Sequence, residues 1–324
     1  MTSEALLQRL RSLTEIAMPL PGAGDTPGRH RQLMEIGRED LSLARLAEAH
    51  WDAISILAEA GRKPEPGAIY GVWASEKPGQ ELSLIPRSGR YSLVGTKMFC
   101  SGAGLVDRAL VTVSKPERFL VDVDLRREVE GFEFNTSGWK SNAFQQTGTA
   151  TATFKEISIL PDEVVGKDGW YLSRPGFWHG ACGPAACWAG GAAGLVDYAM
   201  QQSRDDPHTL AHLGAMNASI WGLRSYLDLA GREIDAKPCD VGEAHSRALI
   251  VRHLVEQACT EVLRRLPRAY GPHPLAFDEE ISRRYQELDL YLRQSHAERD
   301  LESLGRELKS QQIRSNEHVS SPVF

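Results

Sequence analysis

The sequence predicts an α+β protein with a short N-terminal helical segment, a β-barrel-like middle domain and a C-terminal four-helix bundle. Two observations lead to this prediction. Apolar residues recur at helical spacing near both ends of the chain, whereas short β-branched and aromatic runs fill its middle. The 324 residues are enough for several substructures around a large core. We expect boundaries at residues 1–66, 67–165 and 166–324.

The first segment is expected to contain two helices. Leucines recur on one helical face within residues 3–17, and Pro19 ends that helix because proline cannot continue it. A longer apolar pattern predicts a single helix over residues 29–60, and Gly61 closes it.

The middle domain shows turn residues between short apolar runs at intervals of roughly eight to twelve residues, which is typical of a sandwich or barrel. The predicted strands are residues 69–73, 91–94, 109–113, 118–123, 131–134 and 149–154.

The remainder of the chain is predicted to be helical. Long helices with short connections indicate a bundle. The predicted helices are residues 177–203, 208–235, 241–266 and 278–311. The tract from Ala181 to Met200 is rich in glycine and alanine and contains Asp197. We interpret it as a tightly packed buried helix rather than a membrane span.

Composition narrows the classes of partner. A formal charge of −6 argues against nucleic acid or an anionic membrane as the main partner. The start of the chain has no apolar run after a basic segment, and the five cysteines are scattered, so we expect a cytoplasmic protein with reduced thiols. His208 and His212 are four residues apart without a third ligand nearby, and we expect no metal site.

Two short motifs resemble the flavin-binding middle domain of the acyl-CoA dehydrogenase family. The first is Trp-Ala-Ser-Glu at residues 73–76, where the family has a Thr/Ser-Glu loop after a strand. The second is Gly-Thr-Lys-Met-Phe-Cys-Ser-Gly-Ala at residues 95–103, where the family has an aromatic-x-Ser/Thr-x-Gly/Ala segment. The order of helices, β domain and bundle is also the order found in that family.

The resemblance implies an FAD cofactor and names its contacts. Ala74, Ser75, Phe99 and Ser101 match positions that hold the isoalloxazine ring in the family. Arg204 lies where the family has an arginine that reaches the flavin pyrophosphate, often across a subunit boundary, and the guanidinium fork suits phosphate. The Gly-Ser-Asp that follows the Thr/Ser-Glu loop in the family is absent here, as is the paired-glycine turn before the last helical region.

The catalytic base is less well marked. Family members carry a glutamate in a Tyr-Glu-Gly segment, and residues 285–300 of this chain lack that segment. The candidates near its position are Glu298 and His296, and a histidine at this place resembles the related flavin monooxygenases of the same fold.

The expected function is therefore FAD-dependent desaturation of an acyl thioester, by α-proton abstraction and hydride transfer to flavin. One alternative is a flavin-dependent monooxygenase of the same fold. Another is a flavin-free, degenerate member that serves as a binding or scaffold subunit, which the lost Gly-Ser-Asp favours. Because long bundle helices commonly self-associate, we expect a homodimer or homotetramer with a small-molecule substrate.

Overall fold

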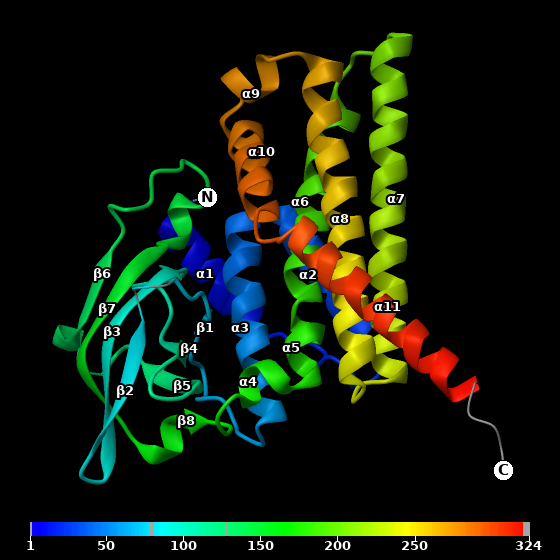
Figure 1. Ribbon diagram of the computed structural model, residues 1–324. Coiled ribbons are helices and arrows are strands. Elements are labelled where there is room, and N and C mark those ends of the chain that lie inside the picture. The colour runs from blue at the N-terminus through cyan, green and yellow to red at the C-terminus, as the bar shows by residue number, and fades with distance from the viewer. Residues whose placement is uncertain (1, 78, 80, 128, 320–324) are drawn as a thin grey trace.

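The structure is a computed structural model, and it describes residues 2–77, 79, 81–127 and 129–319. Helices from both ends of the chain stand side by side, and the strands form a separate lobe against them (Figure 1). We call residues 68–165 the β lobe. The mixed α+β composition predicted from the sequence is confirmed.

The N-terminal segment forms three helices: α1 (Ser3–Thr14), α2 (Thr26–Glu39) and α3 (Leu41–Glu59). The prediction of one helix over residues 29–60 is wrong, because the chain becomes extended at Asp40, with φ −160° and ψ 130°. The Asp40 carboxylate accepts a hydrogen bond from the backbone N–H of Leu43 at 2.9 Å and so caps α3. Aspartates cap several other helices in the same way, namely Asp25, Asp206, Asp240 and Asp278.

Within its described residues, the β lobe has eight strands in two open four-stranded sheets rather than the expected barrel. One sheet has the order β1-β4-β5-β8 and the other the order β2-β3-β7-β6. The strands are β1 (Tyr70–Trp73), β2 (Leu82–Arg87), β3 (Arg90–Cys100), β4 (Arg108–Val113), β5 (Phe119–Asp124), β6 (Phe132–Asn135), β7 (Ala150–Ile159) and β8 (Val164–Val165). All six predicted strands are present; β2 and β8 were not predicted.

The described residues of the C-terminal half form four helices of 20 residues or more, α6, α7, α8 and α11, with shorter helices between them. The helices are α4 (Trp170–Ser173), α5 (Pro175–Gly180), α6 (Cys182–Gln201), α7 (Pro207–Ala236), α8 (Val241–Tyr270), α9 (His273–Phe277), α10 (Glu279–Leu292) and α11 (Glu298–Val319). The predicted helix over residues 278–311 is two helices, since the chain turns between α10 and α11. As a result, α11 crosses the bundle obliquely (Figure 1).

Helices α2 and α6 are in direct backbone contact. A β-carbon on Gly37 would lie 2.4 Å from the Cys187 carbonyl oxygen, and one on Gly190 would lie 2.1 Å from the Met34 carbonyl oxygen. Only glycine fits at these positions, which explains the glycine- and alanine-rich sequence of α6 and confirms it as a tightly packed buried helix. One apolar core runs continuously from α1 through the β lobe to α10. Among the described residues, no helix is long and apolar enough to cross a bilayer.

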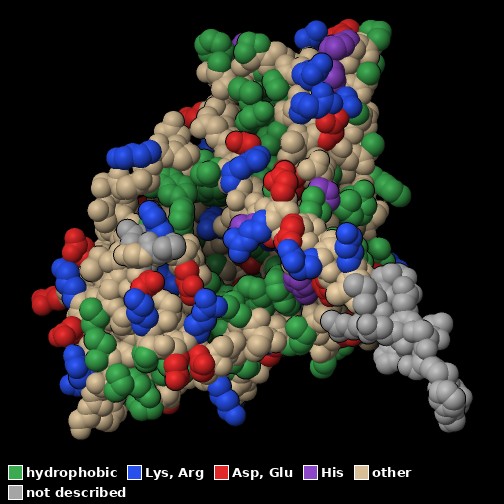
Figure 2. Space-filling view, viewed as in Figure 1, with side chains coloured by type: hydrophobic (Ala, Val, Ile, Leu, Met, Phe, Trp, Pro, Cys, Tyr) green, Lys and Arg blue, Asp and Glu red, His purple; other side chains and the backbone are tan. Residues whose placement is uncertain are grey.

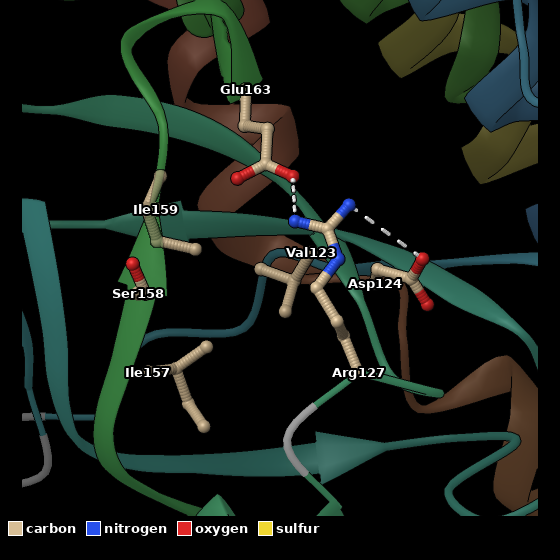
Figure 3. A pocket seen from close by; sticks show the side chains of 7 residues that line it. All are labelled: Val123, Asp124, Arg127, Ile157, Ser158, Ile159 and Glu163. Carbon is tan, nitrogen blue, oxygen red and sulfur yellow. Dashed lines mark hydrogen bonds and ion pairs between the residues drawn. The ribbon is translucent and has the colours of Figure 1, made fainter. Parts of the chain in front are cut away.

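A small hollow lies on the β lobe between β5 and β7 (Figure 3). The Arg127 guanidinium donates to Glu163 at 3.0 Å across its rim, and Ile157 and Ile159 form one wall. Its volume of about 10 Å³ is roughly enough for one water molecule, so it is too small for a ligand.

Candidate functional site

The ends of β1 and β3 meet at the side of the β lobe that faces the helices. The Trp73 indole N–H donates to the Ser101 carbonyl oxygen at 2.9 Å, and Trp73 is buried. This bond fixes the two predicted flavin-binding motifs against each other, although they are more than twenty residues apart in the sequence. Ala74 is half-buried and Ser75 is exposed directly after β1.

A β-bulge directs Phe99 out of the sheet. In the β3–β7 pairing, Lys97 faces Ala152 and Cys100 faces Ala150, so β3 carries one extra residue at this point. Phe99 adopts a φ of +59°, which is costly for a non-glycine residue, and 49% of its surface is exposed. Its ring meets Trp139 edge-on, with the ring centroids 6.5 Å apart. Strained residues of this kind cluster at ligand sites, and an exposed aromatic ring is available for stacking.

A chain of buried hydroxyls leads inward from Ser101. Its Oγ lies 2.9 Å from Thr149 Oγ1, which lies 2.9 Å from Thr147 Oγ1. Thr147 in turn donates to the Phe144 carbonyl oxygen at 2.8 Å. Because this last bond orients the chain, the Ser101 hydroxyl has a defined position at the rim of the β lobe.

Helix α3 contributes a cation to the same place. Arg45 Nε donates to Ser101 Oγ at 3.2 Å. Its Nη1 and Nη2 donate to the side-chain oxygen of Gln294, at 2.5 and 3.0 Å, in the orientation of the amide that satisfies both partners. Gln294 belongs to the turn between α10 and α11, two residues before His296. Arg45 therefore connects three distant parts of the chain at one point.

Aromatic rings extend this contact into the bundle. The Arg45 guanidinium lies 5.1 Å from the Tyr291 ring centroid, and the Arg252 guanidinium lies 4.7 Å from that of Trp188. Arg252 also donates to the Gln294 carbonyl oxygen at 2.8 Å. The helical side of the site thus presents guanidinium groups held on aromatic faces.

Lys97 lies on the opposite side of strand β3 and has a structural role. Its ammonium group donates to the backbone oxygen and the hydroxyl of Thr112 at 2.7 and 2.6 Å, which ties the two sheets together. Burial lowers the pKa of Lys97 to about 8.

The space between the β lobe and the helices is hollowed at the surface (Figure 2). Planar aromatic and hydroxyl groups on one side and a guanidinium on the other are the groups that suit an isoalloxazine ring, whose edge carries carbonyl oxygens and ring nitrogens. The residues present therefore fit a flavin at this position.

Three predicted residues lie away from the Ser101 contact. Arg204 is exposed in the loop between α6 and α7, where it pairs with Asp206 at 2.7 Å. His296 has 61% of its side chain exposed, and its Nδ1 lies 3.3 Å from Asp300. Glu298 is the exposed first residue of α11. His296 and Glu298 lie two and four residues after Gln294 along the chain, whereas Arg204 lies in another loop, between α6 and α7.

A larger groove lies at the other end of α10. It has a volume of about 360 Å³ and is bordered by α2, α6 and α10. Arg38 and Asp197 form a two-bonded ion pair on its wall, at 2.5 and 2.7 Å. Gln201 and Gln202 lie on its edge, directly before the loop that carries Arg204.

Sequence reasoning missed Arg45, Gln294 and Tyr291. Arg45 lies within a helical pattern in which a charged residue is normally assigned to the solvent face, and Gln294 lies in a turn inside the helix predicted over residues 278–311. Their proximity to Ser101 depends on how the helices pack against the β lobe, and local sequence does not determine that.

The chain is similar to a curated protein of known activity. No protein-family model matches the chain. The dibenzothiophene monooxygenase of Rhodococcus erythropolis is 25% identical over 278 residues, which cover 72% of this chain. The chain spans 66% of that relative's length, just under two thirds.

Solved structures are similar over most of the chain. TdsC from Paenibacillus sp. A11-2, in a complex with FMN and indole, has a TM-score of 0.74 at 19% identity, covering 86% of this chain and 82% of its own. KijD3, in complex with FMN and a dTDP-linked amino-keto sugar, has a TM-score of 0.76 at 15% identity, covering 96% and 91%. Methanesulfinate monooxygenase MsuC from Pseudomonas fluorescens has a TM-score of 0.74 at 18% identity, covering 99% and 92%.

These likenesses show the fold. The chain has the acyl-CoA dehydrogenase-like flavoprotein fold, and the resemblance stated from its sequence is confirmed at that level. Within the fold, three of these similar proteins are monooxygenases by name, and two of the structures are complexes with FMN.

Proposed function

We propose that this chain is a flavin-dependent monooxygenase whose flavin lies between the β lobe and helix α3. In such a reaction a reduced flavin supplies two electrons to O₂, one oxygen atom enters the substrate and the other leaves as water. This was the alternative expected from the sequence, and we now place it ahead of desaturation of an acyl thioester.

The observation that carries the proposal is the contact of Arg45 with Ser101. Among the described residues Arg45 forms no ion pair with a carboxylate. Its guanidinium donates to Ser101 and Gln294 and lies against the Tyr291 ring. A cation at this place stabilises negative charge on a reduced flavin ring or on oxygen. Desaturation instead needs a carboxylate base facing the ring, and Glu298 is exposed at the start of α11.

On the β lobe, Phe99 would cover one edge of the ring. The Ser101 oxygen would accept from a ring N–H, because the Ser101 proton is donated inward to Thr149. Ala74 and Ser75 would contact the ring from the loop after β1. His296, whose side chain is exposed, would exchange protons with solvent. We expect the ring rather than the nucleotide to be recognised, so FMN and FAD are both candidates in place of the FAD expected earlier.

The substrate is expected to be a small molecule, and the partner a second copy of the chain. Helix α7 carries Leu210, Trp221 and Leu229 on its surface, and 73% of Trp221 is exposed. It stands at the outer edge of the bundle (Figure 1). We propose that copies associate through this helix. Arg204, in the loop just before α7, could then reach the phosphate of a partner's flavin.

The test is a flavin titration followed by an oxygen assay. Tryptophan fluorescence and the visible spectrum are measured with added FMN or FAD, and oxygen uptake is then measured with chemically reduced flavin. Tight binding with oxygen uptake above that of free reduced flavin is expected, and Ser101→Ala should weaken the binding. A protein that binds neither flavin would overturn both oxidoreductase functions and leave the flavin-free binding subunit. Bleaching of bound oxidised flavin by acyl-CoA thioesters, without oxygenation, would favour the dehydrogenase.

A further inference from the structure

One face of helix α3 carries two acidic residues, Glu48 and Asp52, on the C-terminal side of Arg45. Arg45, Glu48 and Asp52 follow one another at helical spacing, so their side chains lie on the same side of α3. Glu48 is only 8% exposed. This face packs against α5 and α6. A β-carbon on Gly183 would lie 2.7 Å from Glu48 Oε1, and one on Gly180 would lie 2.6 Å from Asp52 Oδ1.

Neither carboxyl group is neutralised by a direct partner. Within the described residues, no hydrogen bond or ion pair joins Glu48 or Asp52 to another side chain or to the backbone. Such an arrangement is rare for a buried carboxylate such as that of Glu48, since buried carboxylates are normally paired or hydrogen-bonded. Asp52 is half-buried, and two acids one helical turn apart also repel each other when both are ionised.

The charged and titratable groups around the pair come from every neighbouring element. The cations are Arg29, Arg45 and Arg252 around Glu48, and Arg174 and Arg29 around Asp52; Glu59 adds a negative charge near Asp52, and Tyr171, Cys187 and Tyr291 complete the surroundings.

Each of three arginines uses its N–H groups elsewhere. Arg29 donates to the Pro19 carbonyl oxygen at 3.1 Å, Arg252 to that of Ala181 at 2.9 Å, and Arg45 to Ser101. They therefore soften the repulsion between the acids without pairing with either of them.

Burial first, and the charge of Asp52 second, raise the pKa of Glu48 to about 8. Burial also raises the pKa of Asp52. Two interacting acids of this kind titrate as a unit, and the pair keeps a proton at a pH where isolated carboxyls have lost theirs.

We propose that Glu48 and Asp52 share one proton at neutral pH, and that Glu48 holds it for the reaction at the Ser101 site. The first half concerns the protein alone. The second half rests on the proposed monooxygenase function.

The chemistry requires such a proton. Substrate, O₂ and the two hydrogens of a reduced flavin give oxygenated substrate, water and oxidised flavin. The oxygen atom that leaves as water must take up protons. Glu48 would break its O–H bond and give that proton to the departing oxygen. It would regain one of the protons released as the reduced flavin is oxidised, so the acid is unchanged after a turnover.

The first experiment measures the proton in the protein without flavin. Infrared difference spectra of wild type and Glu48→Gln are compared across pH 5 to 9. We expect wild type to show the carbonyl band of a protonated carboxylic acid, the variant to lack it, and Asp52→Asn to move its titration to lower pH. The exposed Glu298→Gln serves as a control that keeps the band. A spectrum without this band at pH 6 to 7 would overturn the proposal.

Thermal unfolding gives a second reading. Because the native pKa of Glu48 lies above its unfolded value, the stability that this group contributes is present at low pH and is lost as pH rises through the native pKa. Glu48→Gln should therefore unfold at the same temperature as wild type near pH 5 and at a higher temperature near pH 9. A variant that is less stable by the same amount at every pH would show that Glu48 has only a structural role.

The role in the reaction is tested with reduced FMN and O₂. If Glu48 supplies the proton, Glu48→Gln should slow enzyme-bound turnover about 100-fold and remove the limb of the pH profile that Glu48 causes, with FMN affinity unchanged. Unchanged turnover with an unchanged profile would refute this half. If no flavin binds, the monooxygenase proposal fails, while the infrared result on the acid pair still stands on its own.

Discussion

The Nε of Arg45 lies 3.2 Å from the Oγ of Ser101, and this single contact joins the second motif of the β lobe to helix α3. Since Arg45 also binds Gln294, a change at any of the three residues is transmitted to the other two. The contact places a positive charge and a hydroxyl side by side at the proposed flavin ring.

Removing the guanidinium should weaken flavin binding. We expect Arg45→Ala to raise the flavin dissociation constant roughly 10- to 100-fold, as a lost hydrogen bond to a charged group does. The flavin dissociation constant of Arg45→Lys should lie between those of wild type and Arg45→Ala, because lysine keeps the charge but not the planar fork. Fluorescence titration with FMN is the measurement, and Arg232→Ala, at an exposed position on α7, is the control. Equal affinities for all variants would contradict the placement of the flavin.

Phe99 should lower the stability of the protein and strengthen its binding of flavin. Phe99→Gly removes a left-handed backbone strain of roughly 1 kcal/mol and also the aromatic ring, so it should unfold no earlier than wild type while binding flavin more weakly. Glu156 has the same φ of +59° and an exposed side chain on β7. Glu156→Gly should therefore gain similar stability with flavin binding intact. Thermal melts of both variants measure the effect of the backbone strain on stability, and flavin titrations measure the effect of the Phe99 ring on binding.

The buried Glu287 should be important for stability. It accepts hydrogen bonds from Ser42 at 2.8 Å and from Arg283 at 3.2 Å, and it joins α10 to α3. Among the described residues, Glu287→Ala leaves Arg283 with Asp40 as its one acidic partner, and it should cost about 3–5 kcal/mol of unfolding free energy in urea. Glu287→Gln should cost less. A loss below about 1 kcal/mol for the alanine variant would show that this network is not essential.

Lys97 should make stability depend on alkaline pH. Its native pKa of about 8 lies below the ordinary value of 10.5. Between these values the unfolded chain binds more protons than the folded one, so the contribution of Lys97 to stability rises with pH. The unfolding free energy of wild type minus that of Lys97→Met should increase by about 3 kcal/mol between pH 7 and pH 11. A constant difference would contradict the lowered pKa. The raised pKa of Glu48 changes stability with pH in the opposite direction. Because Glu48 is present in both wild type and Lys97→Met, its contribution cancels in this difference.

The exposed indole on α7 should contribute to self-association. If copies meet through this helix, Trp221→Glu should shift the protein to a smaller species in size-exclusion chromatography with light scattering. Phe277→Glu, which is exposed away from α7, is the matched control. A monomeric wild type would contradict the association and, with it, the proposed role of Arg204.

Local sequence predicted the β lobe well because turns and alternation are local properties. The strand β2 was missed because Pro86 lies in its apolar run. The structure places β2 at the edge of its sheet, where a missing N–H does no harm. The boundary at Asp40 was missed because α2 and α3 have apolar faces at compatible spacing, and Pro267 was taken as a helix end although α8 continues to Tyr270.

Of the candidate site, the sequence predicted the part that one strand pair can hold. Phe99 and Ser101 lie in a recognisable motif, and their proximity to Trp73 follows from it. The helical half could not be predicted, because Arg45 comes 56 positions before Ser101 and meets it only after the bundle has packed. The exposed positions of His296 and Glu298 also depend on where α10 ends.

The glycine contact between α2 and α6 has a consequence for how the chain can be divided. A chain that began at residue 67 would leave the face of α6 around Gly190 open to water, with no side chain there to shield the backbone. Its β lobe and long helices would then lack the surface on which they pack. We expect such a truncated protein to aggregate, whereas the same N-terminal helices supplied as a separate peptide should restore a soluble complex. The first 66 residues would thus be a separable part of one packed structure rather than an independently folding unit.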